Sequence, residues 1–103
     1  MFIAILDLLT TLEYRSEILA QLESEQPTIT AMKGCESFRV FTQRGEGTSI
    51  TAIHEWDEES SFDAYLGSDA FARSGAVLRP LLAGPPLSRR CLIHPVRHSR
   101  MLR

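Results

Sequence analysis

The sequence predicts an α+β domain whose elements follow in the order βαββαβ, with a four-stranded antiparallel sheet and helices on one face. Three observations predict this class: an apolar run of strand length at the N-terminus, a stretch of helical periodicity after it, and two strand-like runs joined by a glycine-containing turn. The chain has 103 residues, 44% of them hydrophobic and 23% charged, with a formal net charge of −2. These values are typical of a single globular domain.

The first strand and the first helix occupy the N-terminal third of the chain. Residues 2–9 form the apolar run, and Thr10 and Glu13 have the spacing of a capping box, which predicts a helix beginning there. Pro27 is expected to kink or end this helix because it lacks an amide donor, and Gly34 is a candidate for its C-cap. The helix is indicated by apolar residues at three- and four-residue intervals, namely Tyr14, Ile18, Leu19 and Leu22.

A β-hairpin follows the first helix. Residues 36–43 and 48–56 are rich in β-branched and aromatic side chains, and the turn "RGEG" joins them through two glycines. The acidic residues 57–59 then suit the N-terminus of a helix, where negative charge is favourable.

The last part of the chain predicts two short helices and a final strand. Gly67 is expected to end the first helix, and Ser68 is expected to cap the second. Pro80 interrupts the second helical pattern, and residues 88–96 have the composition of a strand. The complete order corresponds to a ferredoxin-like fold.

The predicted strands carry apolar residues on both faces. In an antiparallel sheet with one solvated face, apolar and polar residues should alternate along each strand. The first strand instead places Ile3 and Ile5 on the side of Asp7, and later strands place Phe41 and Ile53 opposite their other apolar residues. Because helices cover only one face of such a sheet, we expect a homodimer in which the sheet faces of two copies pack together.

Charge is distributed unevenly along the chain. All 13 acidic residues lie between Asp7 and Asp69, whereas the C-terminal end is rich in arginine. We assign residues 1–96 to the domain and expect residues 97–103 to form a flexible basic tail. This tail is short and lacks aromatic residues for base stacking, so no nucleic-acid partner is expected.

The sequence also favours a cellular compartment and indicates neither a membrane-spanning helix nor a metal site. Cys35 and Cys91 are too few for a disulfide framework, which favours a reducing cytoplasm. No apolar stretch approaches the roughly 20 residues of a membrane helix, and Asp7 interrupts the N-terminal run, which argues against a signal peptide. Cys91, His94 and His98 have a zinc-like spacing, but the first two would point to opposite faces of a strand, so no metal is expected.

Three segments together resemble a known family. They are "KGCESFRVF", "HEWDEESSFDAYLGSDAF" and "LRPLLAGPPLSRRCLI". In this order and at these spacings they are similar to the antibiotic biosynthesis monooxygenase family, whose members are dimeric alpha+beta barrels. The resemblance implies a dimer of ferredoxin-like sheets. For function the resemblance implies several possibilities, since members oxygenate polycyclic aromatic compounds without metal or flavin, degrade haem, isomerise small phosphorylated carbonyl compounds, or have no known activity.

Few of the functional residues that the resemblance implies are present at the matching positions of this chain. Trp56 matches a tryptophan that lines the pocket in members that oxygenate aromatic polyketides. Those members also have an asparagine, a tyrosine and an arginine at positions that here hold Ala52, Phe62 and Ala76. In haem-degrading members, a tryptophan and the haem-ligating histidine stand at the positions of Tyr65 and Gly75.

His54 and Tyr65 are candidate catalytic residues. Cofactor-free oxygenation needs a proton acceptor near neutral pH, donors for an oxyanion, and a dry aromatic pocket. His54 shares a strand face with Trp56 and has a suitable side chain for proton acceptance; the alternative is a satisfied histidine at a strand end. Tyr65 is a candidate donor, and its alternative is a boundary tyrosine whose hydroxyl lies in water.

Asp7 is the third candidate catalytic residue. A carboxylate in the middle of an apolar strand must pair, become protonated or face a cavity, because an unpaired buried charge is costly. Arg39 is its expected partner, either in a structural ion pair of the dimer or in an active-site pair. Trp56, Phe62 and Arg39 are the expected substrate-binding residues. The alternative for Trp56 is a core position in which its indole N–H finds a backbone partner.

The sequence therefore predicts a cofactor-independent monooxygenase acting on a small aromatic or polyketide-like compound. A non-catalytic dimer of the same fold that binds a small molecule is one alternative, and haem binding or haem degradation is another. We expect a cavity in each protomer between the sheet and the helical segment after Trp56, lined by Trp56 with His54 or Tyr65.

Overall fold

The computed structural model describes residues 1–45 and 47–94 and has the predicted order of elements. Two helices, α2 and α3, make up the second helical region, and a short 3-10 turn, η1, follows them. The elements are β1 (Phe2–Leu9), α1 (Arg15–Thr30), β2 (Cys35–Thr42), β3 (Ser49–Trp56), α2 (Glu59–Leu66), α3 (Asp69–Leu78), η1 (Arg79–Leu81) and β4 (Leu87–Leu92).

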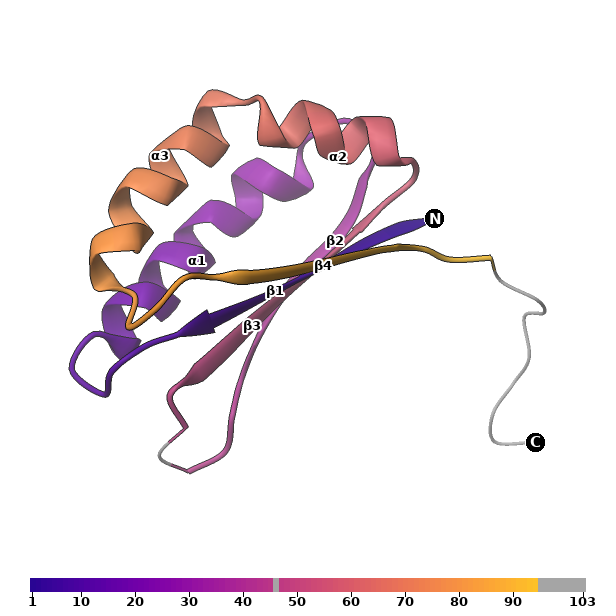
Figure 1. The fold of residues 1–103 in the computed structure, drawn as a ribbon. Coiled ribbons are helices and arrows are strands. Elements are labelled where there is room, and N and C mark those ends of the chain that lie inside the picture. Colours follow the sequence, from indigo (N-terminus) through magenta and orange to yellow (C-terminus); the bar gives the residue numbers. More distant parts are fainter. Residues whose placement is uncertain (46, 95–103) are drawn as a thin grey trace.

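The four strands form one antiparallel sheet in the order β2-β3-β1-β4. All three helices lie on one face of this sheet, and no described helix lies on the other (Figure 1). The predicted α+β, ferredoxin-like architecture with helices on one face is therefore confirmed. None of the described helices has the length and apolar character needed to cross a membrane.

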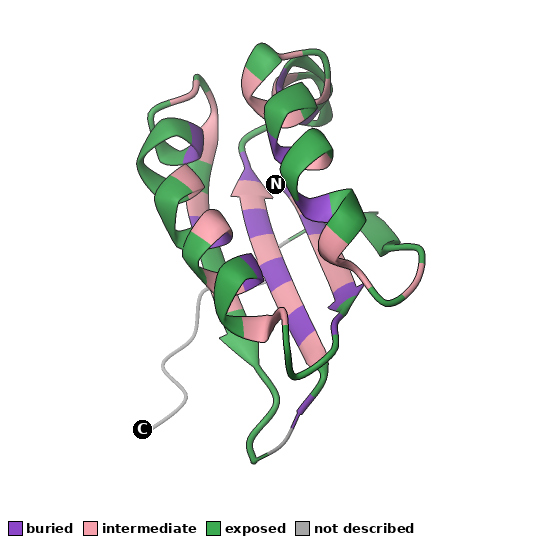
Figure 2. Cartoon of the chain, turned by 90° about the vertical axis from the view of Figure 1, so that its left-hand side faces the viewer, coloured by how far each residue is buried: buried purple, intermediate pink, exposed green. Residues whose placement is uncertain are grey.

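The strand register gives the sheet a helix-covered face and an opposite face. Along β3 the residues alternate between buried and half-buried, and the even-numbered ones are buried under the helices. Figure 2 shows such alternation along the sheet. The core comprises this row and apolar residues from the helices, and its largest fully buried side chains are Trp56, Leu8, Ile18, Ile29 and Ile50.

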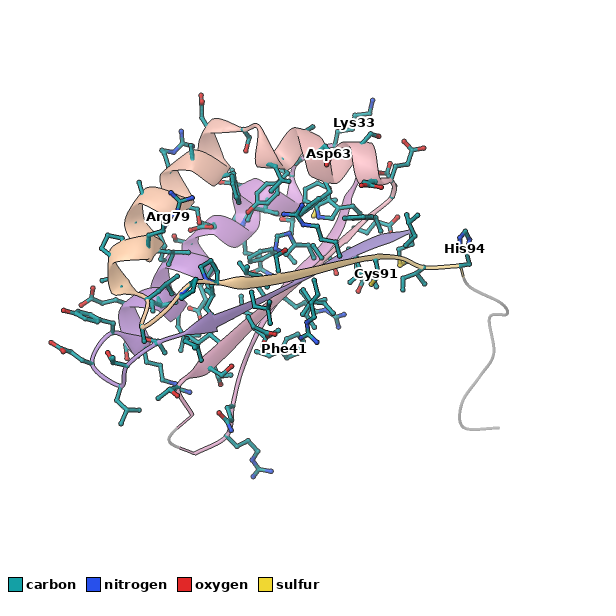
Figure 3. All side chains as sticks on the ribbon, in the orientation of Figure 1. Lys33, Phe41, Asp63, Arg79, Cys91 and His94 are labelled. Carbon is teal, nitrogen blue, oxygen red and sulfur yellow. The ribbon has the colours of Figure 1, made fainter. Side chains whose placement is uncertain are left out.

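The face opposite the helices carries apolar side chains that the protomer does not bury. Ile3, Ile5 and Ile53 are half-buried there. Phe41 is 45% exposed and points away from the helices (Figure 3). Leu87 on β4 is 59% exposed and stands opposite Asp7. These side chains occupy the face on which the sequence predicts dimerisation.

The predicted capping box does not form. Helix α1 begins at Arg15, and Tyr14 is its N-cap without a side-chain cap. Thr10 instead continues the pairing of β1 beyond its last residue, since its backbone N–H donates to the Thr48 carbonyl at 2.9 Å. Its hydroxyl donates to the Thr11 carbonyl at 2.8 Å. Thr10 is therefore paired in the sheet, although its spacing from Glu13 predicted that it would cap the helix.

Pro27 does not end α1, which continues to Thr30. The proline lacks only its own donor; its carbonyl still accepts the Ala31 N–H at 3.2 Å. Gly34 lies beyond the C-cap, which is Ala31, and was therefore wrongly predicted to be the cap. It has φ +85°, and its carbonyl accepts the Asp57 N–H at 2.8 Å, so it joins the end of α1 to the segment before α2.

The predicted limits of the later helices are confirmed. Gly67 is the C-cap of α2, and the Ser68 hydroxyl accepts the Phe71 N–H at 3.2 Å at the start of α3. The last strand ends at Leu92 rather than at residue 96, because Leu92 stands opposite Phe2, the first residue of β1. The proposed tail, residues 97–103, lies outside the described residues.

Candidate functional site

The sequence-predicted site residues lie on two opposite faces of the sheet. Strand β3 directs His54 and Trp56 toward the helices, because both belong to its buried row. Helix α2 brings Phe62 and Tyr65 to the same space, where both are buried. Asp7 and Arg39 belong to the odd-numbered rows of β1 and β2, which face the other way. The structure therefore separates them from the other four.

The four residues on the helix-covered face form an aromatic cluster. The Tyr65 ring stacks on Trp56 with their centroids 5.5 Å apart, and it meets the His54 ring edge-on at 5.5 Å. Phe62 lies 6.1 Å from both His54 and Tyr65. On the other side of His54, the Phe38 ring from β2 is 4.9 Å away. With the Trp56 ring at 6.4 Å, four aromatic rings lie around the imidazole.

Two adjacent cavities lie between the sheet and the helices. The larger, of about 190 Å³, is lined by His54, Tyr65 and Phe62 and is floored by Ala4. The smaller, of about 110 Å³, extends toward α1 and α3 and shares His54 and Tyr65 with the larger one. Trp56 lines neither cavity, because its fully buried indole lies behind Tyr65. The expectation that Trp56 forms the cavity wall is therefore wrong.

Burial determines the protonation of the two polar groups at the cavities. Desolvation lowers the pKa of His54 to about 4, so its imidazole is neutral at pH 7. Desolvation also raises the pKa of Tyr65 far above its usual range, with smaller contributions from the negative charge of Glu25 and from Cys35. The tyrosine therefore keeps its proton and can donate a hydrogen bond, while the histidine can accept a proton.

Two ring nitrogens in this cluster have no hydrogen-bond partner among the described residues. They are Nδ1 of His54 and Nε1 of Trp56, both fully buried. The backbone partner expected for the indole N–H is thus not present. An unpaired buried polar atom typically costs about 1–3 kcal/mol, so the packing of this cluster carries a penalty of that size for each nitrogen.

Asp7 and Arg39 do not pair with each other within the protomer. Asp7 accepts from the Thr51 hydroxyl at 2.7 Å and from the Arg89 guanidinium at 2.7 Å. Arg39 pairs with Glu55 at 2.9 Å. The strand order explains the difference, since β3 separates β2 from β1, so each charge meets a partner on an adjacent strand. Asp7 consequently shares no cavity with His54 in one protomer.

Several polar residues that line the cavities are not among the sequence-predicted site residues. Arg90 and Ser88 of β4 contribute to the larger cavity. Glu25 and Arg79 contribute to the smaller one. A signal for the first pair was available, because alternate residues of a strand share a face. The register of β4 against β1 was needed to tell which face that is.

No metal-binding cluster of three or more His, Cys, Asp or Glu side chains occurs in the described part of the chain. His98, a member of the zinc-like spacing, is not among the described residues. The haem alternative gains no ligand from Gly75, which lines the smaller cavity without a side chain. His54 is the one imidazole that lines either cavity within the described residues.

Solved structures with the same fold extend over almost the whole chain. Rv0793 from Mycobacterium tuberculosis superposes with a TM-score of 0.82 at 18% identity, covering 96% of this chain and 98% of that one. A Deinococcus radiodurans protein with the antibiotic biosynthesis monooxygenase name superposes with a TM-score of 0.88 at 13% identity, covering 97% and 99%. A conserved protein from Methanosarcina mazei reaches 0.82 at 19% identity, covering 87% and 89%. At these identities the likeness concerns the fold.

Family membership follows from the sequence itself. Among curated proteins, none matches this chain. The family model described as antibiotic biosynthesis monooxygenase matches residues 1–76, which include β1, both strands of the hairpin and the aromatic cluster. The chain therefore belongs to the antibiotic biosynthesis monooxygenase family.

Proposed function

We propose that this protein is a cofactor-independent monooxygenase that acts on a small aromatic compound in the cavity beside His54 and Tyr65. The observation that carries the proposal is a neutral, buried imidazole that lines an otherwise largely apolar cavity. Membership of a family named for monooxygenases supports the reaction class.

His54 is the proposed proton acceptor. A histidine whose pKa is about 4 is a weak base toward bulk water, because its cation loses hydration on burial. The same low dielectric strengthens the attraction between an imidazolium and an adjacent substrate anion. Proton transfer from a bound phenol or quinol therefore creates an ion pair inside the cavity, which is far less costly than an isolated imidazolium.

Tyr65 is the proposed hydrogen-bond donor to the substrate oxyanion. Its raised pKa keeps the hydroxyl protonated throughout the reaction. The ring is held in place by Trp56 on one face and by the edge of Phe71, at 5.2 Å, so the donor is positioned by packing. A preorganised donor in a water-poor site stabilises developing negative charge more strongly than water does.

The oxygenation step needs no redox cofactor when the substrate supplies the electrons. The deprotonated substrate passes one electron to O2, and the resulting radical combines with superoxide to form a C–O bond. The hydroperoxide that results takes up a proton and loses water from the carbon that also carried hydrogen, which leaves a new C=O group. One oxygen atom thus enters the product and the other leaves as water.

A homodimer formed through the uncovered sheet faces completes the proposal. Half-buried Ile3, Ile5 and Ile53 support it, since a second sheet would remove them from water. The ion pair between Asp7 and Arg89 then lies within the interface, where Arg39 of one copy is also available to the other. The two free cysteines, Cys35 and Cys91, are consistent with a reducing cytoplasm as the setting.

A non-catalytic small-molecule-binding dimer is the second candidate. It is favoured by the low basicity of His54. It is also favoured by Ala52 and Ala76, which stand where the resemblance to members that oxygenate polyketides implies an asparagine and an arginine. A binding protein needs the cavity but no proton acceptor.

Oxygen uptake with a panel of single-ring quinols and other hydroxyaromatic compounds separates the two candidates. The wild-type protein is expected to consume O2 with at least one member, and His54→Gln, which keeps the size and polarity of the side chain, is expected to lower kcat by roughly 10²–10⁴-fold. Tyr65→Phe is expected to lower it less, because only one hydrogen bond is lost. Uptake that His54→Gln leaves unchanged, or no uptake with any compound that binds, contradicts the enzyme proposal.

A further inference from the structure

Arg90 and His54 occupy one row across the helix-covered face of the sheet. Ala4 of β1 stands opposite His54 on one side and opposite Arg90 on the other. Two strand spacings therefore separate the two polar residues, which places their Cα atoms roughly 9–10 Å apart. Because Ala4 has only a methyl group, the space above it stays open, and it forms the floor of the larger cavity.

The larger cavity has one permanently charged residue among those that line it, the cation Arg90. None of its lining residues is a carboxylate. In the described part of the chain the ion pairs are Arg39 with Glu55 and Arg89 with Asp7, so Arg90 has no acidic partner there. His54 does not add charge at pH 7, because it is neutral when buried. The electrostatics of this cavity therefore favour an anion.

The guanidinium of Arg90 is held in position at the cavity. It lies 5.0 Å from the centroid of the Phe62 ring, a cation–π geometry, and its Nε is 3.3 Å from the Ser88 hydroxyl. Phe62 itself lines the cavity, so the charge sits against the cavity wall. A stacked guanidinium still has donors in its plane that can bind a carboxylate in a bidentate manner.

The size of the cavity limits the ligand to about one ring. A cavity of roughly 150 Å³ is sufficient for benzene, and the larger cavity measures about 190 Å³. We infer that the preferred ligand is a single-ring hydroxyaromatic acid, with its hydroxyl group toward His54 and its carboxylate bound by Arg90. This inference rests on the proposed function for the role of His54, and it adds the substrate class and a specificity-determining residue.

Anaerobic calorimetry with gentisate, a quinol that carries a carboxylate, tests the inference. Its neutral amide, gentisamide, is the matched ligand, because it keeps the ring and both hydroxyl groups. The wild-type protein is expected to bind gentisate roughly 10–100-fold more tightly than gentisamide, the range for a hydrogen bond to a charged group. Arg90→Gln is expected to abolish this preference, and Arg90→Lys, which keeps the charge without the planar fork, to retain part of it.

Arg44→Gln is the control, since Arg44 is an exposed arginine in the turn between β2 and β3 and lines neither cavity. It is expected to keep the preference for gentisate. Equal affinities for the two ligands in the wild-type protein, a preference that survives Arg90→Gln, or its loss in Arg44→Gln would each overturn the inference.

Binding and oxygen uptake fail independently, which keeps the two proposals distinguishable. Arg90-dependent binding of gentisate without O2 uptake supports this inference and contradicts the proposed enzyme function. Uptake with neutral quinols, without any preference for the carboxylate, supports the enzyme function and overturns the inference.

Discussion

The His54 imidazole is 4% exposed and packs between Phe38 of β2 and Tyr65 of α2. A protonated ring there would lose its hydration and gain no carboxylate partner in the described part of the chain, which is why burial lowers the pKa of His54 to about 4. The folded protein therefore opposes protonation of this side chain, whereas the unfolded chain accepts a proton near pH 6.5.

This difference predicts a loss of stability in acid. Between pH 6.5 and about 4 the unfolded state binds more protons at His54, so the free energy of unfolding falls as the pH falls through this window. The full contribution is about 3 kcal/mol, reached below the folded pKa. Urea unfolding at pH 7 and pH 4.5 is the measurement, and His54→Gln, which cannot titrate, is the comparison.

Other groups near His54 and elsewhere also respond to acid, so the comparison between the two proteins is essential. Tyr65 lines the cavity beside the imidazole, and its raised pKa keeps its proton in place in this range. The other charged groups, Arg90 and Glu25 at the cavities and the exposed Asp57, are present in both proteins. The wild-type protein is expected to lose more stability than His54→Gln. An equal loss in the two proteins contradicts the assignment.

Trp56 is expected to contribute to stability rather than to ligand binding. Its side chain is fully buried and lines neither cavity, so Trp56→Phe leaves a void in the core. We expect a loss of roughly 1–3 kcal/mol in the free energy of unfolding, with the affinity for a small aromatic ligand changed little. Calorimetry and urea unfolding on the same variant check both parts. Weakened binding at unchanged stability would return Trp56 to the cavity wall.

Gly34 lies between α1 and β2 and contacts the N-terminus of α2. Gly34 has φ +85°, and a Cβ there would overlap the Asp57 carboxylate and the Ser61 side chain. That carboxylate accepts hydrogen bonds from the Glu58 N–H and the Ser61 hydroxyl, both at 2.7 Å, at the N-terminus of α2. Because α2 carries Phe62 and Tyr65 to the cavity, this close approach also positions the site.

Gly34→Ala is therefore expected to destabilise the protein more than Gly45→Ala. Gly45 has a similar φ of +75°, but a Cβ there meets open space, so its substitution isolates the backbone cost. That cost is about 1–2 kcal/mol. Urea unfolding of both variants gives the difference, which measures the additional clash at Gly34. Equal losses would show that Asp57 and Ser61 move aside freely.

Local sequence patterns predicted the helices and strands well. The predictions that were wrong concern residues whose structure depends on pairing with distant segments. Gly67 and Ser68 end and begin helices as their side chains suggest. Thr10 has a capping-box spacing, yet it pairs with Thr48 and Leu82 at the end of β1, because these neighbouring segments supply a competing set of hydrogen bonds. The length of β4 likewise depends on where β1 begins, which no local pattern in residues 88–96 contains.

The candidate site was predictable in part for the same reason. Alternation along one strand correctly placed His54 with Trp56, and it placed Asp7 with the other odd-numbered residues of β1. Alternation along a strand does not determine how that strand aligns with the next one. The separation of Asp7 from His54, and the arrival of Arg90 in the row of His54, depend on that alignment. Membership of the family could not supply the place of Arg90 either, since the family model ends at residue 76.

The whole protomer presents two unequal surfaces, one formed by helices and the other by the bare sheet (Figure 1). The sheet surface carries Ile3, Ile5 and Ile53 around the ion pair of Asp7 with Arg89. Apolar side chains that surround a paired charge suit a self-complementary contact, because a twofold axis would place each copy's isoleucines against the other's. We expect a dimer that buries at least roughly 1,200 Å².

Phe41→Glu tests this assembly, with Val77→Glu as its control. Both side chains are 45% exposed apolar groups, but Phe41 lies on the bare sheet face and Val77 lies on α3. Each substitution adds the same charge at the same exposure, so the two should affect the isolated protomer similarly. In the dimer only Phe41→Glu would bury a carboxylate, in the row that already contains Asp7. Sedimentation at micromolar concentration is expected to show dimers for the wild type and Val77→Glu and monomers for Phe41→Glu. A monomeric wild type would contradict the dimer, and a dimer disrupted by Val77→Glu alone would place the contact elsewhere.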